Sequence, residues 1–135
     1  MKKSFVKSDN EWRTQLTTEQ FRICRLKETE PPFSGSLYSC QDEGMYCCVC
    51  CGNQLFSSNE KFNSGSGWPS FWNPHSVDCV RYETDDNLGM HRIEVLCNDC
   101  NAHLGHVFDD GPKPSGKRYC VNSASLAFNK LDTSN

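Results

Sequence analysis

The spacing of apolar positions changes partway along the chain, and this change separates a short helical part from a longer strand-rich part. In the first part, Thr17 and Gln20 have the spacing of a capping box, which predicts a helix through the apolar residues that follow. Asp9 is expected to cap a shorter helix before it. Pro31 disfavours helical geometry in the residue before it, so we expect the helical part to end there.

From Met45 onward, short apolar runs alternate with turn residues, which is typical of β-strands. Glycine, proline, asparagine and aspartate mark the turns, most clearly in the loop 111–116. The predicted strands cover residues 45–48, 54–56, 68–71, 80–84, 90–96, 104–108, 118–121 and 126–129. We therefore expect a mainly β fold of antiparallel strands, preceded by two or three short helices.

Length and composition narrow the class of protein. A chain of 135 residues can bury a core of its own, and we expect a single domain over residues 1–135 with its core at about 10–129. No run approaches the ~18–20 apolar residues of a membrane span, and no apolar secretory segment is visible, so we expect a cytoplasmic protein. Its 14 basic residues are scattered among 17 acidic ones, which argues against a nucleic-acid partner.

The chain contains ten cysteines, which indicates either a disulfide framework or metal and redox chemistry. Cys97 and Cys100 form one C-x-x-C pair, and we choose Cys48 and Cys51 as the other because Gly52 follows directly. A zinc knuckle turns tightly after its second cysteine, and glycine accepts positive φ there. Four thiolates in two such pairs predict one structural zinc ion with no open coordination position.

The alternatives for these cysteines are buried free thiols or disulfides. Cys47 and Cys50 belong to the other register of the same cysteine run. We expect both to be small buried residues or spare thiols rather than ligands.

Cys120 stands alone, between Arg118 and Asn122, after a loop rich in glycine and proline. An isolated cysteine is often an inert core residue. Here His103 and His106 lie within 17 residues upstream, and a histidine beside a thiol can activate it and supply a proton. The segment therefore indicates a thiol active site, although one of the two histidines could be a structural residue bonded to a backbone carbonyl.

Several motifs together resemble the B-type methionine sulfoxide reductases, which act on the R epimer of methionine sulfoxide. They are TEPPFSG at 29–35, the two C-x-x-C pairs, KFNSGSGWPSF at 61–71, HLGHVFDDGP at 103–112 and RYCVNS at 118–123. The resemblance covers about residues 10–129 in order. It implies two antiparallel sheets, a structural zinc ion, a thioredoxin-like reductant and the repair of oxidised proteins, and we expect a monomer.

The resemblance also implies roles for particular residues. Cys120 would attack the sulfoxide sulfur and be left as a sulfenic acid. His103 and His106 would help to protonate the sulfoxide oxygen, directly or through water, and Asn122 would hold that water or polar group.

In the same way, Trp68 would pack on the methyl group of the substrate, so that only one sulfur epimer presents its oxygen to the acid. Phe108 would belong to the apolar wall. Without the family resemblance, core packing in a glycine-rich turn would be the simpler reading of Trp68.

The sequence departs from the family pattern at the positions of the resolving cysteine, the residue that clears the sulfenic acid. Many members have a resolving cysteine at the position of Ser66, and another branch has it at the position of Ser34. Outside the predicted zinc site, Cys40, Cys24 and Cys79 remain as resolving candidates, with Cys40 preferred because it follows Ser34 on an expected loop. Direct reduction without a resolving cysteine stays open.

Two other classes of function explain part of the pattern. A zinc-ribbon interaction module would account for the cysteine pairs but would leave His103, His106, Cys120 and Trp68 without a purpose. A cysteine hydrolase would use Cys120 with a histidine, but it needs an oxyanion hole and an orienting group that the sequence does not identify.

Overall fold

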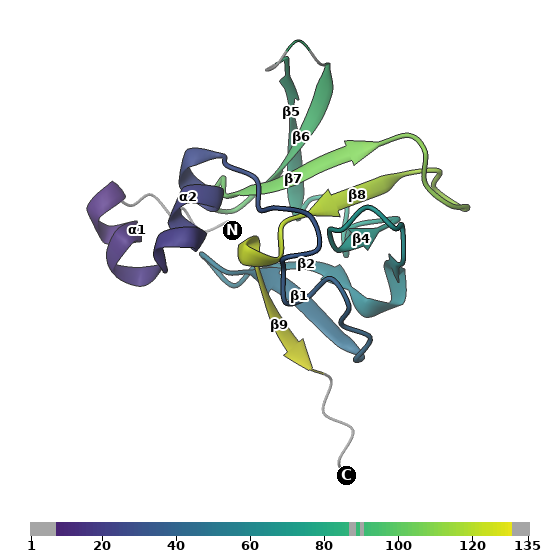
Figure 1. Ribbon diagram of the computed structural model, residues 1–135, viewed down its shortest axis with the longest axis horizontal. Helices are drawn as coiled ribbons and strands as arrows, with labels where there is room; N and C mark the ends of the chain where they lie inside the picture. The colour runs from purple at the N-terminus through teal and green to yellow at the C-terminus, as the bar shows by residue number, and fades with distance from the viewer. Residues whose placement is uncertain (1–7, 87–88, 90, 131–135) are drawn as a thin grey trace.

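The computed structural model describes residues 8–86, 89 and 91–130, and these form two short helices and two antiparallel sheets (Figure 1). The helices are α1 (Asp9–Gln15) and α2 (Thr18–Leu26), and two single-turn 3₁₀ helices are η1 (Ser58–Glu60) and η3 (Ser123–Ser125). The strands are β1 (Gly44–Cys48), β2 (Gln54–Ser57), β3 (Lys61–Phe62), β4 (Ser70–Phe71), β5 (Val80–Asp85), β6 (Arg92–Cys97), β7 (His103–Phe108), β8 (Arg118–Val121) and β9 (Leu126–Lys130). The predicted mainly β fold with short N-terminal helices is confirmed.

The two helices begin and end through local caps. The capping box of Thr17 and Gln20 is present, as predicted, and it opens α2. The prediction that Asp9 caps the first helix is wrong, because Ser8 holds that position and its hydroxyl accepts the Glu11 N–H. Helix α2 also ends earlier than the prolines require, because Lys27 adopts a left-handed φ of 64° that stops the helix.

The core lies between the two sheets. The smaller sheet has the strand order β2-β1-β9 and contributes Tyr46 and Phe56, which are fully buried. Phe71 of the larger sheet stacks on Phe56, with ring centroids 4.5 Å apart, and meets Tyr46 edge-on at 5.1 Å. Aromatic pairs of this kind stabilise a core beyond the area that they bury.

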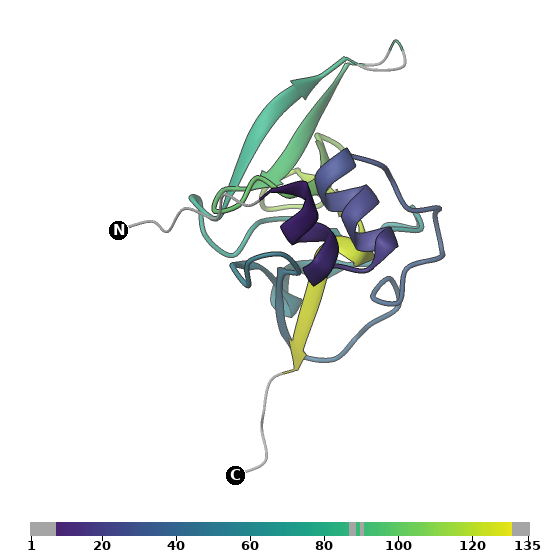
Figure 2. The ribbon, with the colours of Figure 1, turned by 90° about the vertical axis from the view of Figure 1, so that its left-hand side faces the viewer.

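The larger sheet has the strand order β3-β4-β8-β7-β6-β5, so β8 lies in its interior between β4 and β7. Strands β5 and β6 form a hairpin that projects from the body of the molecule (Figure 2). This arrangement matters for the site, because Arg92 at the turn end of the hairpin and Cys120 on interior strand β8 line the same cavity.

Two strand predictions differ from the structure. The predicted strand 68–71 is paired only at Ser70–Phe71, because Pro69 has no N–H to donate and Gly67 has a φ of 95°. The two-residue strand β3 was not predicted. Residue 90, at the start of the predicted strand 90–96, lies outside the described residues, and β6 begins at Arg92.

Helix α2 packs against β7 and η3, on the side where the chain of β8 continues into β9. The Arg25 guanidinium donates to the carbonyl of Cys100 at 2.8 Å, which ties the helix to the turn before β7. Among the described residues, no helix has the length and apolar character needed to cross a bilayer.

Candidate active site and metal centre

Four cysteine sulfurs from two distant parts of the chain lie within 4.8 Å of one another. The sulfurs of Cys48 and Cys100 are 3.6 Å apart, and those of Cys51 and Cys97 are also 3.6 Å apart. All four cysteines are buried except Cys51, which is half-buried. The structure therefore brings together the four residues that the spacing predicted.

Each cysteine pair is followed by a tight turn, and the two turns are of the same type. The residue after the second cysteine has a positive φ, 82° at Gly52 and 66° at Asn101. Its N–H donates to the carbonyl of the first cysteine, Cys48 or Cys97, at 2.8 Å in each case. Glycine and asparagine are the residues that adopt this conformation most readily. The turn predicted from Gly52 is present, with an equivalent turn in the second pair.

This donor set fits a structural zinc ion, because four converging thiolates complete a tetrahedral shell and leave no position for a substrate. A zinc ion held by these cysteines would cross-link the β1–β2 turn to the turn between β6 and β7. None of the ten cysteines, all of which lie in the described residues, forms a disulfide. Cys47 and Cys50 are buried outside the set of four, and the Cys47 sulfur accepts a hydrogen bond from the Asn129 amide at 3.4 Å.

Cys120 is on interior strand β8, which carries none of the four clustered cysteines. Its side chain is half-buried. It pairs directly with Ser70 on β4 and with His106 on β7. Directly opposed residues in an antiparallel pair have their side chains on the same face. The Cys120 sulfur opens into a cavity of about 320 Å³, whose lining includes Trp68, His106, Phe108, Arg118 and Asn122.

Arg118 is the nearest charged partner of the thiol. Its guanidinium donates to the Cys120 sulfur at 2.7 Å and makes two hydrogen bonds to the Asp110 carboxylate, at 2.8 and 3.1 Å. The hydrogen bond to Asp110 raises the pKa of Arg118, and the guanidinium also lies over the Phe108 ring, 4.5 Å from its centroid. Arg118 was not predicted as a site residue, although the two-residue alternation of a strand places it on the same face as Cys120.

His106 is held by a carboxylate. Its Nε2 lies 2.8 Å from Asp85 Oδ2, and Asp85 also accepts from Arg92 at 3.3 Å. Because an ionised carboxylate only accepts, this contact assigns the Nε2 proton to His106 and leaves Nδ1 as the other ring nitrogen. His106 therefore lines the cavity beside Cys120, its partner across the strand pair, and Asp85 fixes the orientation of its ring.

His103 lies behind His106, with ring centroids 5.6 Å apart, and it is 2% exposed. Its Nδ1 is 2.7 Å from Glu94 Oε2, and the other Glu94 oxygen lies 3.3 Å from Lys27 Nζ. Burial lowers the pKa of His103, although the hydrogen bond to Glu94 acts in the opposite direction. Its Nε2 has no hydrogen-bond partner among the described residues.

Both histidines are thus bound to carboxylates rather than to a backbone carbonyl. The two carboxylates come from the projecting hairpin, Asp85 from β5 and Glu94 from β6. Neither carboxylate was predicted from the sequence. The only local indication of a role was that Glu94 lies between apolar neighbours in its strand.

Asn122 lines the Cys120 cavity, and both ends of its side-chain amide are bound to the backbone. Its Oδ1 accepts the backbone N–H of Glu30 at 3.0 Å, and its Nδ2 donates to the carbonyl of Leu104 at 3.0 Å. The carbonyl of Glu30 in turn accepts the indole N–H of Trp68 at 2.9 Å. Asn122 therefore links the strand that contains Cys120 to the indole at the cavity wall.

Glu30 connects Asn122 to Trp68, and it was not predicted from the sequence as a functional residue. Its buried carboxylate accepts the backbone N–H groups of Ser123 and Ala124, at 2.8 and 3.0 Å. Burial raises the pKa of Glu30, and the two backbone hydrogen bonds act in the opposite direction. One residue thus fixes Trp68 and the start of η3 together.

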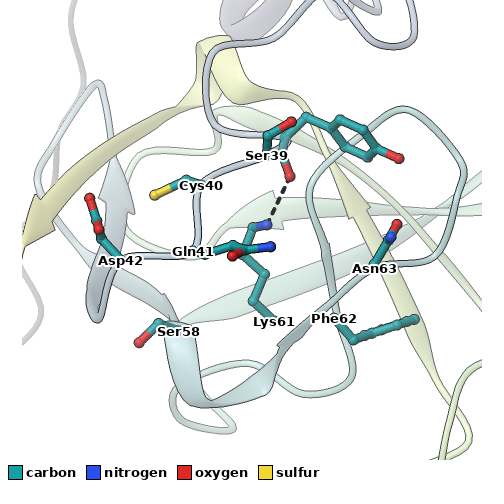
Figure 3. A pocket seen from close by; sticks show the side chains of 9 residues that line it. Ser39, Cys40, Gln41, Asp42, Ser58, Lys61, Phe62 and Asn63 are labelled. Carbon is teal, nitrogen blue, oxygen red and sulfur yellow. Dashed lines mark hydrogen bonds between the residues drawn. The ribbon is translucent and has the colours of Figure 1, made fainter.

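The three resolving candidates differ in accessibility. Cys24 and Cys79 are buried, whereas Cys40 is half-buried and lines a separate pocket of about 340 Å³ beside Lys61 (Figure 3). The Lys61 ammonium donates to the carbonyl of Tyr38 at 2.9 Å, which holds the loop that contains Cys40.

A half-buried thiol beside a guanidinium and a carboxylate-bound histidine, with a separate four-cysteine cluster, defines a thiol enzyme with a structural metal site. A family model described as the SelR domain matches residues 16–130. Proteins named peptide methionine sulfoxide reductase MsrB are similar over nearly the whole chain. The relative from Hahella chejuensis is 57% identical over 93% of this chain and 91% of its own.

Two further relatives with the same name give the same result. The Methanosarcina barkeri protein is 55% identical over 93% of this chain and 89% of its own. The Leptospira interrogans protein is 56% identical over 92% of this chain and 95% of its own. The chain belongs to the MsrB family of peptide methionine sulfoxide reductases, as the sequence motifs predicted.

Proposed function

We propose that this protein reduces the R epimer of methionine sulfoxide, mainly in proteins, to methionine, and that the whole chain acts as one domain. The observation that carries the proposal is the Cys120 sulfur in a cavity, 2.7 Å from the Arg118 guanidinium and paired across the sheet with His106. A guanidinium beside a thiol favours the thiolate, which is the nucleophilic form.

In the first step, the Cys120 thiolate attacks the sulfoxide sulfur while a proton passes to the sulfoxide oxygen. His106 supplies that proton from Nδ1, because Asp85 engages its Nε2. His103 stands behind as a second proton site, oriented by Glu94. Each histidine ring is thus positioned by a carboxylate, and His106, which lines the cavity, is the general acid.

In the second step, the bond between the two sulfurs breaks and the hydroxyl passes from the substrate sulfur to the Cys120 sulfur. The substrate then leaves as the thioether of methionine, and Cys120 is left as a sulfenic acid. The substrate sulfur gains two electrons and the cysteine sulfur loses two, so the step is balanced. Trp68 and Phe108 form the apolar wall for the substrate methyl group, and Asn122 and Glu30 hold the indole of Trp68 in place. A wall on one side leaves only one epimer with its oxygen toward the histidines.

A thioredoxin-like reductant completes the cycle. Cys40 is the accessible resolving candidate, since Cys24 and Cys79 are buried in the core. Direct attack of the reductant on Cys120 is the alternative route. We also propose a monomer that works in the cytoplasm, with no nucleic-acid or membrane partner.

The test offers peptides that contain R or S methionine sulfoxide to the protein with dithiothreitol as reductant. The proposal expects reduction of the R epimer alone, and its loss in Cys120→Ser. Reduction of neither epimer, or full activity in Cys120→Ser, would overturn it.

A further inference from the structure

Two further buried cysteines, Cys24 and Cys50, lie beside the cluster of four sulfurs. Cys50 belongs to the same turn as Cys48 and Cys51, and its thiol contacts the thiols of Cys48 and Cys100. Cys24 comes from helix α2, and its thiol contacts that of Cys50. Six thiols therefore form one buried group, although a single tetrahedral zinc ion needs only four of them.

The sulfurs of Cys48 and Cys100 have the spacing of a shared edge. They are 3.6 Å apart. With zinc–sulfur bonds of about 2.3 Å, two ligands of one tetrahedral ion are separated by roughly 3.8 Å. Thiolate sulfurs can bridge two zinc ions, as in Zn₂Cys₆ modules. Cys50 contacts both ends of this edge and Cys24 contacts Cys50 in turn, so these two thiols supply the remaining ligands of a second ion.

Ser125 holds the Cys24 thiol beside the turn that contains Cys50. The Cys24 sulfur donates to the Ser125 hydroxyl at 3.7 Å, and the Ser125 carbonyl accepts the N–H of Val49 at 2.9 Å. Cys24 and Cys50 lie outside the set of sulfurs that are all within 4.8 Å of one another, so a second shell closes by a shift of these two side chains. A thiol is a weak donor, and breaking its bond to Ser125 costs little.

The charge of the group favours a second ion. A second dication is balanced by the two thiolates that it recruits, so the net charge of the cluster does not grow. Arg25 lies on the same side, where its guanidinium donates to the Cys100 carbonyl at 2.8 Å and lies 4.5 Å from the centroid of the Trp12 ring. Its Nη1 is buried and has no hydrogen-bond partner among the described residues, so it can donate to the anionic cluster.

We propose that a second zinc ion binds beside the first, held by Cys24, Cys50 and the two shared ligands Cys48 and Cys100. Cys24 and Cys50 each release a proton on binding, and no electron is transferred. The second ion fastens helix α2 to the turn between β1 and β2, which the first ion does not reach. This site goes beyond the reductase function and does not depend on it.

The experiment counts metal ions in the full chain. Reduced protein is loaded with excess zinc, desalted and weighed by native mass spectrometry. We expect two zinc ions in the wild type and one in Cys50→Ser and in Cys24→Ser, and the ion that remains shows that the first site is intact. Cys47→Ser is the matched control, because this buried cysteine of the same run bonds Asn129, and it should keep two ions. One ion in the wild type, or two in Cys50→Ser, would overturn the inference.

Cadmium NMR of the wild-type protein tests the bridging without any substitution. Cadmium takes the place of zinc in thiolate sites, and two ions that share Cys48 and Cys100 give two signals that are coupled to each other through the bridging sulfurs. A single signal would overturn the second site, and two signals without coupling would overturn the shared ligands. Neither measurement uses methionine sulfoxide, so its result is independent of whether the proposed reductase activity is found.

Discussion

The hydroxyl oxygen of Ser66 lies 3.7 Å from the sulfur of Cys120, on the segment that leads to Trp68. Family members with a resolving cysteine at this position have a second thiol where this chain has a hydroxyl. A serine cannot form a disulfide, so the proposed sulfenic acid on Cys120 would have to be cleared by another thiol, either of this chain or of the reductant.

Ser66→Cys should restore that second thiol. We expect Cys120 to form a disulfide with the new cysteine after one turnover without reductant, because the side chains are already in contact. Peptide mass mapping checks the pairing. A Ser66→Cys protein that keeps Cys120 as sulfenic acid would contradict the prediction.

Cys40→Ser tests the native route in the same assay. We expect slower thioredoxin-dependent turnover, with the first equivalent of methionine formed at an unchanged rate, because Cys40 would act only after the sulfenic acid has formed. Unchanged turnover would instead indicate direct attack of the reductant on Cys120.

Arg118 should control the reactivity of the thiol. Arg118→Met removes the guanidinium that lies 2.7 Å from the Cys120 sulfur, and we expect alkylation by iodoacetamide at neutral pH to slow by about tenfold. Arg118→Lys keeps the charge but loses the paired contacts with Asp110, so an intermediate rate is expected. An alkylation rate that is equal in all three proteins would remove Arg118 from the mechanism.

His103 should make stability depend on pH. Burial lowers the pKa of His103 in the folded protein, so the unfolded chain binds more protons between that lowered value and about 6.5. The free energy of unfolding should therefore decrease as the pH falls through this window, by at most about 1.4 kcal/mol for each pH unit.

Urea unfolding of wild type and His103→Gln between pH 8 and pH 5.5 measures this effect. Contributions of the zinc thiolates are common to both proteins and cancel in the difference. The exposed His75 provides the control, and His75→Gln should keep the wild-type slope. A wild-type slope in His103→Gln would contradict the assignment.

Glu30 should position Trp68 without contacting the substrate. Glu30→Gln loses one acceptor and sets an amide N–H against a backbone N–H of η3, and an unsatisfied buried donor costs about 1–3 kcal/mol. We expect a lower melting temperature, a higher KM and faster solvent exchange of the Trp68 indole N–H. Glu28→Gln makes the same chemical change at an exposed ion pair and should alter none of these.

The zinc site should act on stability alone. Cys97→Ser removes one of four ligands, so we expect loss of the metal and a lower melting temperature, with alkylation of Cys120 unaffected while the protein stays folded. Metal content and calorimetry check this. Loss of activity with metal loss at unchanged stability would mean that the ion takes part in the chemistry.

The sequence predicted best what is decided locally. The capping box of Thr17 and Gln20 spans four residues, and the turn after Cys51 follows from one glycine. The approach of His106 to Cys120 was also expected from their short separation along the chain, and the two residues are paired across β7 and β8. In each case the relevant physical cause acts within a few residues, so no knowledge of the sheet was needed.

The missed residues depend on long-range pairing. Glu30 reaches Ser123 and Ala124 across more than 90 positions, a contact that no local pattern indicates. Asp85 and Glu94 meet the histidines only because the β5–β6 hairpin pairs with β7, with an irregularity in the register next to Val95. Arg118 could have been predicted from the sequence, since the alternation of side chains along a strand places it on the same face as Cys120.

The most direct measurement of the central claim is a single turnover without reductant. The reduced protein is mixed with a peptide that contains methionine-R-sulfoxide, and the released methionine and the oxidation state of every cysteine are determined by mass mapping. The account predicts one methionine per protein and an oxidised Cys120, either as a sulfenic acid or in a disulfide. Methionine formation with Cys120 still reduced, or no methionine at all, would contradict it.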